Sequence, residues 1–171
     1  MTLLPEITAT QTHSYDREEN DKPFDDLVHI GGWPAKQSIK RITSIVVHFD
    51  SSRVNGIEIS YELSSGMGIL TKHGRSTGES ARVDFEEGTL LVSAFGSSIS
   101  QIGFMTFNTR GGAIQIYGPF GWKPRPGEPP SYVIPYGTFG NIIAFNGTEN
   151  DKGELKGIGF YKTDPQVPAY V

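Results

Sequence analysis

The sequence predicts an all-β domain. Its 171 residues include 21 glycines and 11 prolines, two residue types that break helices, and these recur along the whole chain. No stretch repeats its apolar residues with the helical period of about 3.6, and turn signals recur roughly every 8–12 residues. This pattern is typical of a β sandwich, barrel or prism, and composition does not distinguish among the three.

The clearest strand signal is the strict alternation of apolar and polar residues over residues 57–63. Because successive side chains of a strand point to opposite faces, four of them should share one buried face: Ile57, Ile59, Tyr61 and Leu63. The preceding segment, Ile39–Phe49, is rich in Ile and Val and predicts a long strand or a bent pair. Between the two, Asn55-Gly56 predicts a tight turn with positive φ.

The rest of the chain divides into an N-terminal extension and one domain. Residues 1–22 are polar and predict a partly disordered extension, and residues 23–171 are expected to form the domain. Further strands are predicted at 81–85, 89–95, 101–108, 113–117, 142–145 and 155–161. The proline-rich stretch 122–135 predicts a long extended loop, and 146–154, which opens with Asn146-Gly147, predicts the last turn.

The overall charge and composition exclude several classes of function. A net charge of -4 and scattered Lys and Arg argue against nucleic-acid binding. No apolar run approaches the roughly 20 residues of a membrane span. The absence of cysteine excludes disulfides and thiolate sites, and the start of the chain does not resemble a secretory signal, so a cytoplasmic protein is expected.

No residue pattern points to catalysis, a metal or a cofactor. The four histidines lack metal-ligand spacing, and no nucleotide-binding or nucleophile motif occurs. Asp25-Asp26 could be read as a catalytic pair. However, neighbouring residues of an extended strand point to opposite faces, which favours a structural turn. His73 is expected to order a turn of its own.

Several short motifs resemble the jacalin-related lectin family. The most specific is Tyr117-Gly118-Pro119-Phe120-Gly121, and Phe24-Asp25-Asp26 is similar to the family's aromatic-Asp-Asp start. Four further segments resemble its strands and turns: 42–47 with 54–61, 72–74, 87–93 and 105–109. The resemblance implies a β-prism I fold, in which three Greek-key four-stranded antiparallel sheets surround one core.

The resemblance also implies a shallow sugar site at one end of the prism. Family members build it from an N-terminal Gly-Gly loop and from a G-x-x-x-D loop before the last strand. The Asp of that motif accepts hydrogen bonds from two sugar hydroxyls, and nearby backbone amides donate to the ring oxygens. A third loop often adds an aromatic side chain that stacks on the sugar.

This chain departs from the family at the residues that would bind sugar. Lys156 occupies the Asp position, and an ammonium group only donates hydrogen bonds whereas a carboxylate only accepts them. Asn20 and Asp21 replace the Gly-Gly pair. The candidate carbohydrate-binding residues are therefore Asn20, Asp21, Phe95, Gly96, Ser97, Asp151, Gly153, Glu154, Leu155 and Lys156.

Two of these assignments leave alternatives open. Asp151 or Glu154 could supply a replacement acceptor, because the last loop is about two residues longer than the family pattern. Phe95 could stack on a sugar or, equally, end a strand and pack beneath a loop.

The predicted function is that of a non-catalytic lectin with weakened or altered specificity, whose partner is a glycan or glycoprotein. One alternative is an interaction or structural module that has lost the sugar site and forms a homodimer through its sheet edges. Another is an enzyme that uses the prism as a scaffold.

Overall fold

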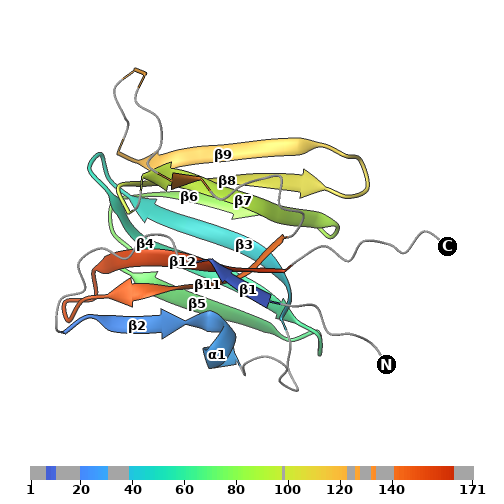
Figure 1. Cartoon of the computed structure of the whole chain (residues 1–171), viewed down its shortest axis with the longest axis horizontal. Helices are drawn as coiled ribbons and strands as arrows, with labels where there is room; N and C mark the ends of the chain where they lie inside the picture. The colour runs from blue at the N-terminus through green and yellow to red at the C-terminus, as the bar shows by residue number, and fades with distance from the viewer. Residues whose placement is uncertain are drawn as a thin grey trace.

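The computed structural model describes residues 7–10, 20–30, 39–97, 99–122, 126–127, 132–133 and 141–163. They form three four-stranded antiparallel sheets arranged as a β-prism, with one short helix (Figure 1). The fold predicted from the family resemblance is thus confirmed.

The first sheet is assembled from both parts of the chain that flank the other two sheets. Its strand order is β1-β12-β11-β2. The strands are β1 (Ile7–Thr10), β2 (Lys22–Asp25), β11 (Asn141–Glu149) and β12 (Leu155–Thr163), and helix α1 (Asp26–Ile30) follows β2 directly. Since β1 pairs with β12, part of the segment expected to be an extension contributes a strand to the sheet.

The other two sheets each use four consecutive strands. The second sheet has the order β5-β4-β3-β6 and the third the order β10-β7-β8-β9. In these two sheets the fourth strand lies beside the first of three hairpin-linked strands, which is the Greek-key arrangement. The second sheet contains β3 (Ile39–Phe49), β4 (Val54–Leu63), β5 (Gly68–Gly74) and β6 (Glu79–Asp84). The third contains β7 (Thr89–Ser97), β8 (Gln101–Asn108), β9 (Ile114–Gly121) and β10 (Tyr132–Val133).

The core lies where the inner faces of the three sheets meet. Tyr61 of β4, Phe104 of β8, and Phe145 and Phe160 of the first sheet are all fully buried. The rings of Phe145 and Phe160 meet edge to face, with centroids 5.0 Å apart. The alternation predicted for residues 57–63 is confirmed, because its four apolar side chains are at most 1% exposed.

Two predicted turns are wrong. Asn55-Gly56 lies inside β4, and the turn comes earlier, at residues 50–53. Asn146-Gly147 lies inside β11, where pairing with β2 on one side and β12 on the other overrides the local preference of Asn-Gly for a turn. A side chain at Gly147 would collide with the carbonyl oxygen of Gly157 and the ring of Phe24.

Five elements were not predicted from the sequence: β1, β2, α1, β5 and β10. β5 includes residues 72–74, which were expected to enter a turn, and β10 lies within the predicted long loop, most of which falls outside the described residues. No helix in the described part of the chain is long and apolar enough to cross a membrane.

Candidate functional site

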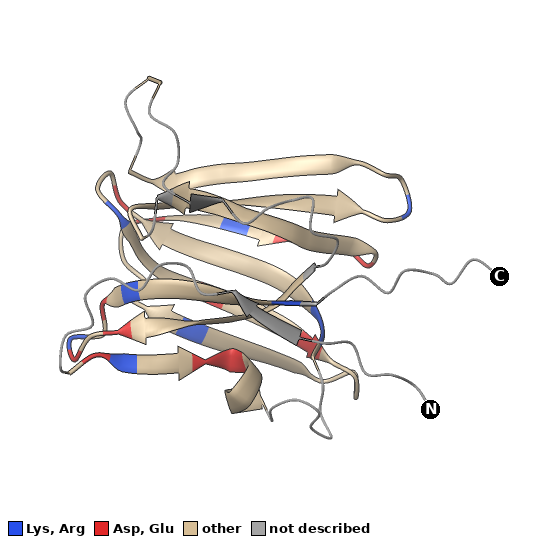
Figure 2. Cartoon of the chain, viewed as in Figure 1, with Lys and Arg blue, Asp and Glu red and all other residues tan. Residues whose placement is uncertain are grey.

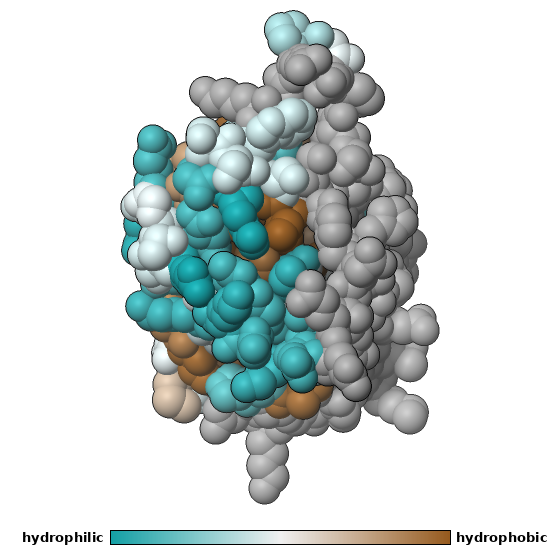
Figure 3. All heavy atoms as spheres, turned by 90° about the vertical axis from the view of Figure 1, so that its left-hand side faces the viewer, coloured by the Kyte–Doolittle hydropathy of each residue, from teal (hydrophilic) through white to brown (hydrophobic). Residues whose placement is uncertain are grey.

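Several loops meet at one end of the prism, which we call the loop end (left in Figure 1). It carries the β3–β4 turn (50–53), the β5–β6 turn (75–78) and the β11–β12 loop (150–154). The guanidinium group of Arg53 donates a hydrogen bond to the carbonyl oxygen of Leu155, and that of Arg75 donates to the carbonyl oxygen of Lys152 at 2.9 Å. The described residues on this face are mostly hydrophilic and surround a small apolar patch (Figure 3).

The β11–β12 loop is built around the side chain of Asn150. Its Oδ1 accepts hydrogen bonds from the backbone amides of Lys152 at 3.0 Å and Glu154 at 2.8 Å. Gly153 adopts a φ of 73°, and its amide donates to the Asn150 carbonyl oxygen at 3.0 Å. Asn150 is itself buried, so the loop has a defined shape that depends on one side chain.

The two candidate acceptors in this loop, Glu154 and Asp151, differ in their contacts with other side chains. Glu154 accepts a hydrogen bond from Nδ2 of Asn150 at 2.7 Å and lies 3.4 Å from the guanidinium group of Arg75. The Asn150 hydrogen bond, followed by the positive charge of Arg75, lowers the pKa of the Glu154 carboxyl. Asp151 is exposed at the tip of the loop and is the more accessible acceptor.

Lys156 and Leu155 occupy an irregular point of the sheet. Glu149 pairs with Leu155 and Thr148 pairs with Gly157, so Lys156 is the extra residue of a β-bulge. Bulges turn a side chain away from the regular alternation of a strand. Leu155 is fully buried in the core and offers the loop end only its backbone, whereas Lys156 is half-buried.

The segment Asn20-Asp21 lies beside this loop, as the family resemblance implies. Lys22 of β2 pairs with Glu149 of β11, which places residues 20–21 next to Asn150. Asn20 is exposed and Asp21 is buried. The structure therefore brings two of the three predicted parts of the site together.

The third predicted part, Phe95-Gly96-Ser97, belongs to β7 in another sheet. Phe95 is half-buried, and its ring covers Gly103 on the neighbouring strand so closely that a Cβ at Gly103 would collide with it. This geometry supports packing of Phe95 against its own sheet. Gly96 pairs with Tyr132 and Ile102, and the side chain of Ser97 lies outside the described residues.

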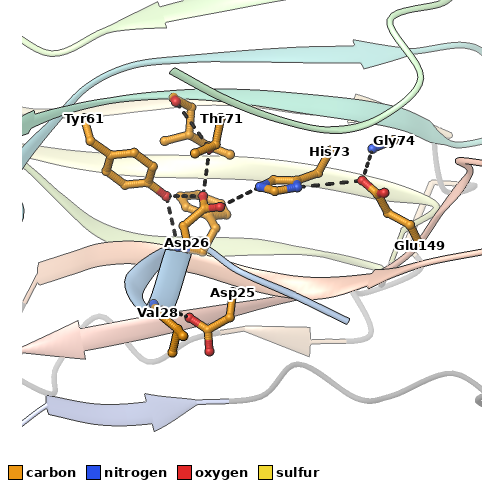
Figure 4. A network of polar contacts seen from close by, with 10 residues as sticks. Asp25, Asp26, Val28, Tyr61, Thr71, His73, Gly74 and Glu149 are labelled. Carbon is orange, nitrogen blue, oxygen red and sulfur yellow. Dashed lines mark hydrogen bonds and ion pairs between the residues drawn. The ribbon is translucent and has the colours of Figure 1, made fainter. Parts of the chain in front are cut away.

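A polar cluster that no sequence pattern predicted joins α1, β4, β5 and the end of β11. Its centre is Asp26, which is 1% exposed (Figure 4). The carboxylate accepts hydrogen bonds from the Tyr61 hydroxyl at 2.6 Å and the Thr71 hydroxyl at 2.8 Å, and Nε2 of His73 lies 2.7 Å from it. Burial, reinforced by the charge of Asp26, raises the pKa of Tyr61 well above its ordinary value, so this phenol remains a donor.

His73 lies between two carboxylates. Its Nδ1 is 3.7 Å from Oε1 of Glu149, and the same oxygen accepts a hydrogen bond from the Gly74 amide at 2.6 Å. The ring of Phe24 stacks on the imidazole with centroids 3.6 Å apart. The signal that could have revealed the cluster is the i, i+2 spacing of Thr71 and His73, which places both on one face of β5.

The two neighbouring aspartates face different partners, although they do not share a strand as expected, because Asp25 ends β2 and Asp26 begins α1. Asp25 accepts a hydrogen bond from the Tyr161 hydroxyl, and its other oxygen accepts one from the Val28 amide at 3.1 Å, which caps the short helix. Burial and the nearby Asp25 raise the pKa of Tyr161 to about 12. The side chains of Asp25 and Asp26 therefore share none of these partners. Within the described residues, no group of three or more His, Asp or Glu side chains could hold a metal ion.

Comparison with known proteins identifies the family. The model of the jacalin-like lectin domain matches residues 24–161, most of the chain. The chain belongs to the jacalin-like lectin family. This membership supports carbohydrate binding as the general function of the domain.

Solved structures of jacalin-related lectins share the fold of this jacalin-like domain. Wild-type Malaysian banana lectin is 20% identical, over 92% of this chain and 100% of that chain, with a TM-score of 0.66. A mannose-binding jacalin-related lectin from Ananas comosus is also 20% identical, over 92% and 99% of the two chains, with a TM-score of 0.66. Calystegia sepium agglutinin is 15% identical, over 96% and 100%, with a TM-score of 0.62. A comparison with curated proteins gave no match.

Proposed function

We propose that this jacalin-like domain binds glycans at the loop end, without catalysis, through residues 20–21 and the β11–β12 loop. The observation that carries the proposal is the juxtaposition of these segments, which the pairing of β2 with β11 enforces. The family match supports it, and relatives of the same fold include a mannose-binding lectin and a lectin solved in complex with a biantennary N-glycan.

The residue at the Asp position of the family motif favours a sugar specificity that differs from that of family members with Asp there. Lys156 supplies a cationic donor where the family pattern has an anionic acceptor. A glycan that carries a carboxylate or sulfate suits such a donor, and exposed Asp151 can accept hydrogen bonds from hydroxyl groups. We therefore propose weak binding of simple neutral mannosides or galactosides and preferential binding of acidic or larger glycans.

A glycan array with the wild-type protein and Lys156→Asp tests this proposal. A hydrogen bond to a charged group contributes about 1.5–3 kcal/mol, so the substitution should reduce binding of acidic glycans by about tenfold or more. Lys152→Asp is the matched control, because it makes the same charge change at an exposed position of the adjoining β11–β12 loop. Equal losses in both variants would show a general charge effect and contradict a specific role for Lys156.

The exposed surface of β9 favours a second candidate, self-association. β9 is the last strand of the third sheet, and its Ile114 and Ile116 are 50% and 61% exposed. Neither β8 nor β9 carries a charged residue (Figure 2). Uncharged edges with exposed apolar side chains pair readily with a second copy. Light scattering should then show a homodimer that Ile116→Lys converts to monomer, and a monomeric wild type would exclude this candidate.

A further inference from the structure

Strand β11 is attached to the second sheet at two points, four residues apart. The backbone amide of Phe145 donates a hydrogen bond to the Tyr61 hydroxyl at 3.2 Å. At the end of the strand, the Glu149 carboxylate accepts the Gly74 amide at 2.6 Å and lies beside His73. Because Tyr61 and His73 both contact Asp26, the two attachments share one anchor (Figure 4).

Among the contacts drawn in Figure 4, His73 is the residue that links the anchor to the end of β11. One ring nitrogen lies 2.7 Å from Asp26 and the other 3.7 Å from Glu149. The stacked ring of Phe24, inclined by only 8°, fixes the plane of the imidazole. His73 is also only 11% exposed, so little water competes for these contacts.

Glu149 is the point from which both segments of the proposed glycan site extend. The next residue, Asn150, organises the β11–β12 loop. Across the strand pair, Lys22 lies opposite Glu149, and Asp21 and Asn20 precede it. A shift of the Glu149 end of β11 would therefore move both segments together.

We infer that His73 is a positioning residue for the glycan site, which holds the end of β11 and the β11–β12 loop in place by joining Asp26 to Glu149. Its role in glycan affinity rests on the proposed function. Its role in ordering the loop does not, and can be measured without a ligand.

Hydrogen exchange of the segment 150–155, together with urea unfolding, tests the inference. In His73→Gln the side-chain amide nitrogen can still donate to Asp26, but the amide has no second donor nitrogen for Glu149, because its oxygen only accepts hydrogen bonds. The matched control is Thr71→Val, which removes another hydrogen bond to Asp26 on the same strand without touching β11. We expect exchange of 150–155 to be about tenfold faster in His73→Gln and unchanged in Thr71→Val.

A double-mutant cycle separates positioning from a general loss of stability. Glu149→Gln keeps an acceptor for the Gly74 amide but removes the charged partner of His73. Its effect on loop exchange should be large in the wild type and absent in the His73→Gln background. Additive effects of His73→Gln and Glu149→Gln on loop exchange would overturn the inference. It would also be overturned if loop exchange followed global stability equally in His73→Gln and Thr71→Val.

The glycan measurement then distinguishes this inference from the proposed function. If an array identifies a ligand, its affinity should fall about tenfold in His73→Gln, or 1.4 kcal/mol, and stay near wild type in Thr71→Val. If the protein binds no glycan, the proposed function is wrong. Hydrogen exchange then still tests whether His73 orders the loop. An unaltered affinity together with faster loop exchange would overturn the role of His73 in binding.

Discussion

The β11–β12 loop and the Asp26 cluster are stabilised in opposite ways. The side-chain hydrogen bonds of Asn150 that shape the loop from within join residues at most four positions apart, whereas Arg53 and Arg75 contact the backbone of Leu155 and Lys152 from other turns. The bonds of the cluster join residues 35 to 75 positions apart and bring together α1, β4, β5 and β11. The shape of the loop is therefore largely a local property, whereas its position on the prism depends on distant parts of the chain.

The largest expected effect is that of removing the centre of the cluster. Asp26→Ala should lower the free energy of unfolding by about 3 kcal/mol or more, because it leaves the buried donors of Tyr61, Thr71 and His73 without their acceptor. Urea denaturation measures this loss.

The neighbouring position supplies the control. Asp25→Ala removes a helix cap and the acceptor of Tyr161, and the loss of a cap costs about 1 kcal/mol. Equal losses for the two aspartates would contradict the distinction between a buried anchor and a surface cap.

A smaller and more local effect is expected from Asn150→Ala. The amides of Lys152 and Glu154 lose their acceptor, so exchange across 150–155 should accelerate while the free energy of unfolding falls by only about 1–2 kcal/mol. Hydrogen exchange read by mass spectrometry checks the first expectation and urea denaturation the second.

Asp151→Ala, at the exposed tip, is the control for that experiment and should leave loop exchange near wild type. If Asn150→Ala lost as much global stability as Asp26→Ala, the loop and the cluster would not be separable.

The smallest expected effect concerns pH. The hydrogen bond from Asn150 lowers the pKa of Glu154, so this group contributes stability that is present above the ordinary Glu range and is lost as the pH falls through the lowered value. Asn150→Ala should raise the pKa of Glu154 and make stability less sensitive to acid in this range. Carboxyl titration by NMR measures the shift.

Asp50 serves as an internal reference in the same titration. Hydrogen bonds from Ser52, chiefly its hydroxyl, and from Asn55 lower the pKa of Asp50 to about 2, independently of Asn150. Asp50 should therefore titrate at about 2 in both proteins, and a parallel shift of Asp50 would mean that the variant perturbs the whole loop end.

Much of the fold could be predicted from local sequence. Alternation identified the buried face of β4, and β8 begins and ends where its residues predicted. The fold itself and the proximity of residues 20–21 to the last loop followed from the family resemblance. The turn predictions at Asn55-Gly56 and Asn146-Gly147 were wrong because each pair is held in a strand by neighbours on the sheet.

The sequence by itself determined the β period, the many turns, the cationic character of position 156 and the residues from which the last loop is built. Only the tertiary structure decided that Lys156 lies in a bulge, that Phe95 covers Gly103, and that His73 joins Asp26 to Glu149. The physical reason is the distance along the sequence between the residues that interact. Alternation and side-chain hydrogen bonds within a turn act over a few residues, whereas buried polar contacts depend on which strands the fold brings together.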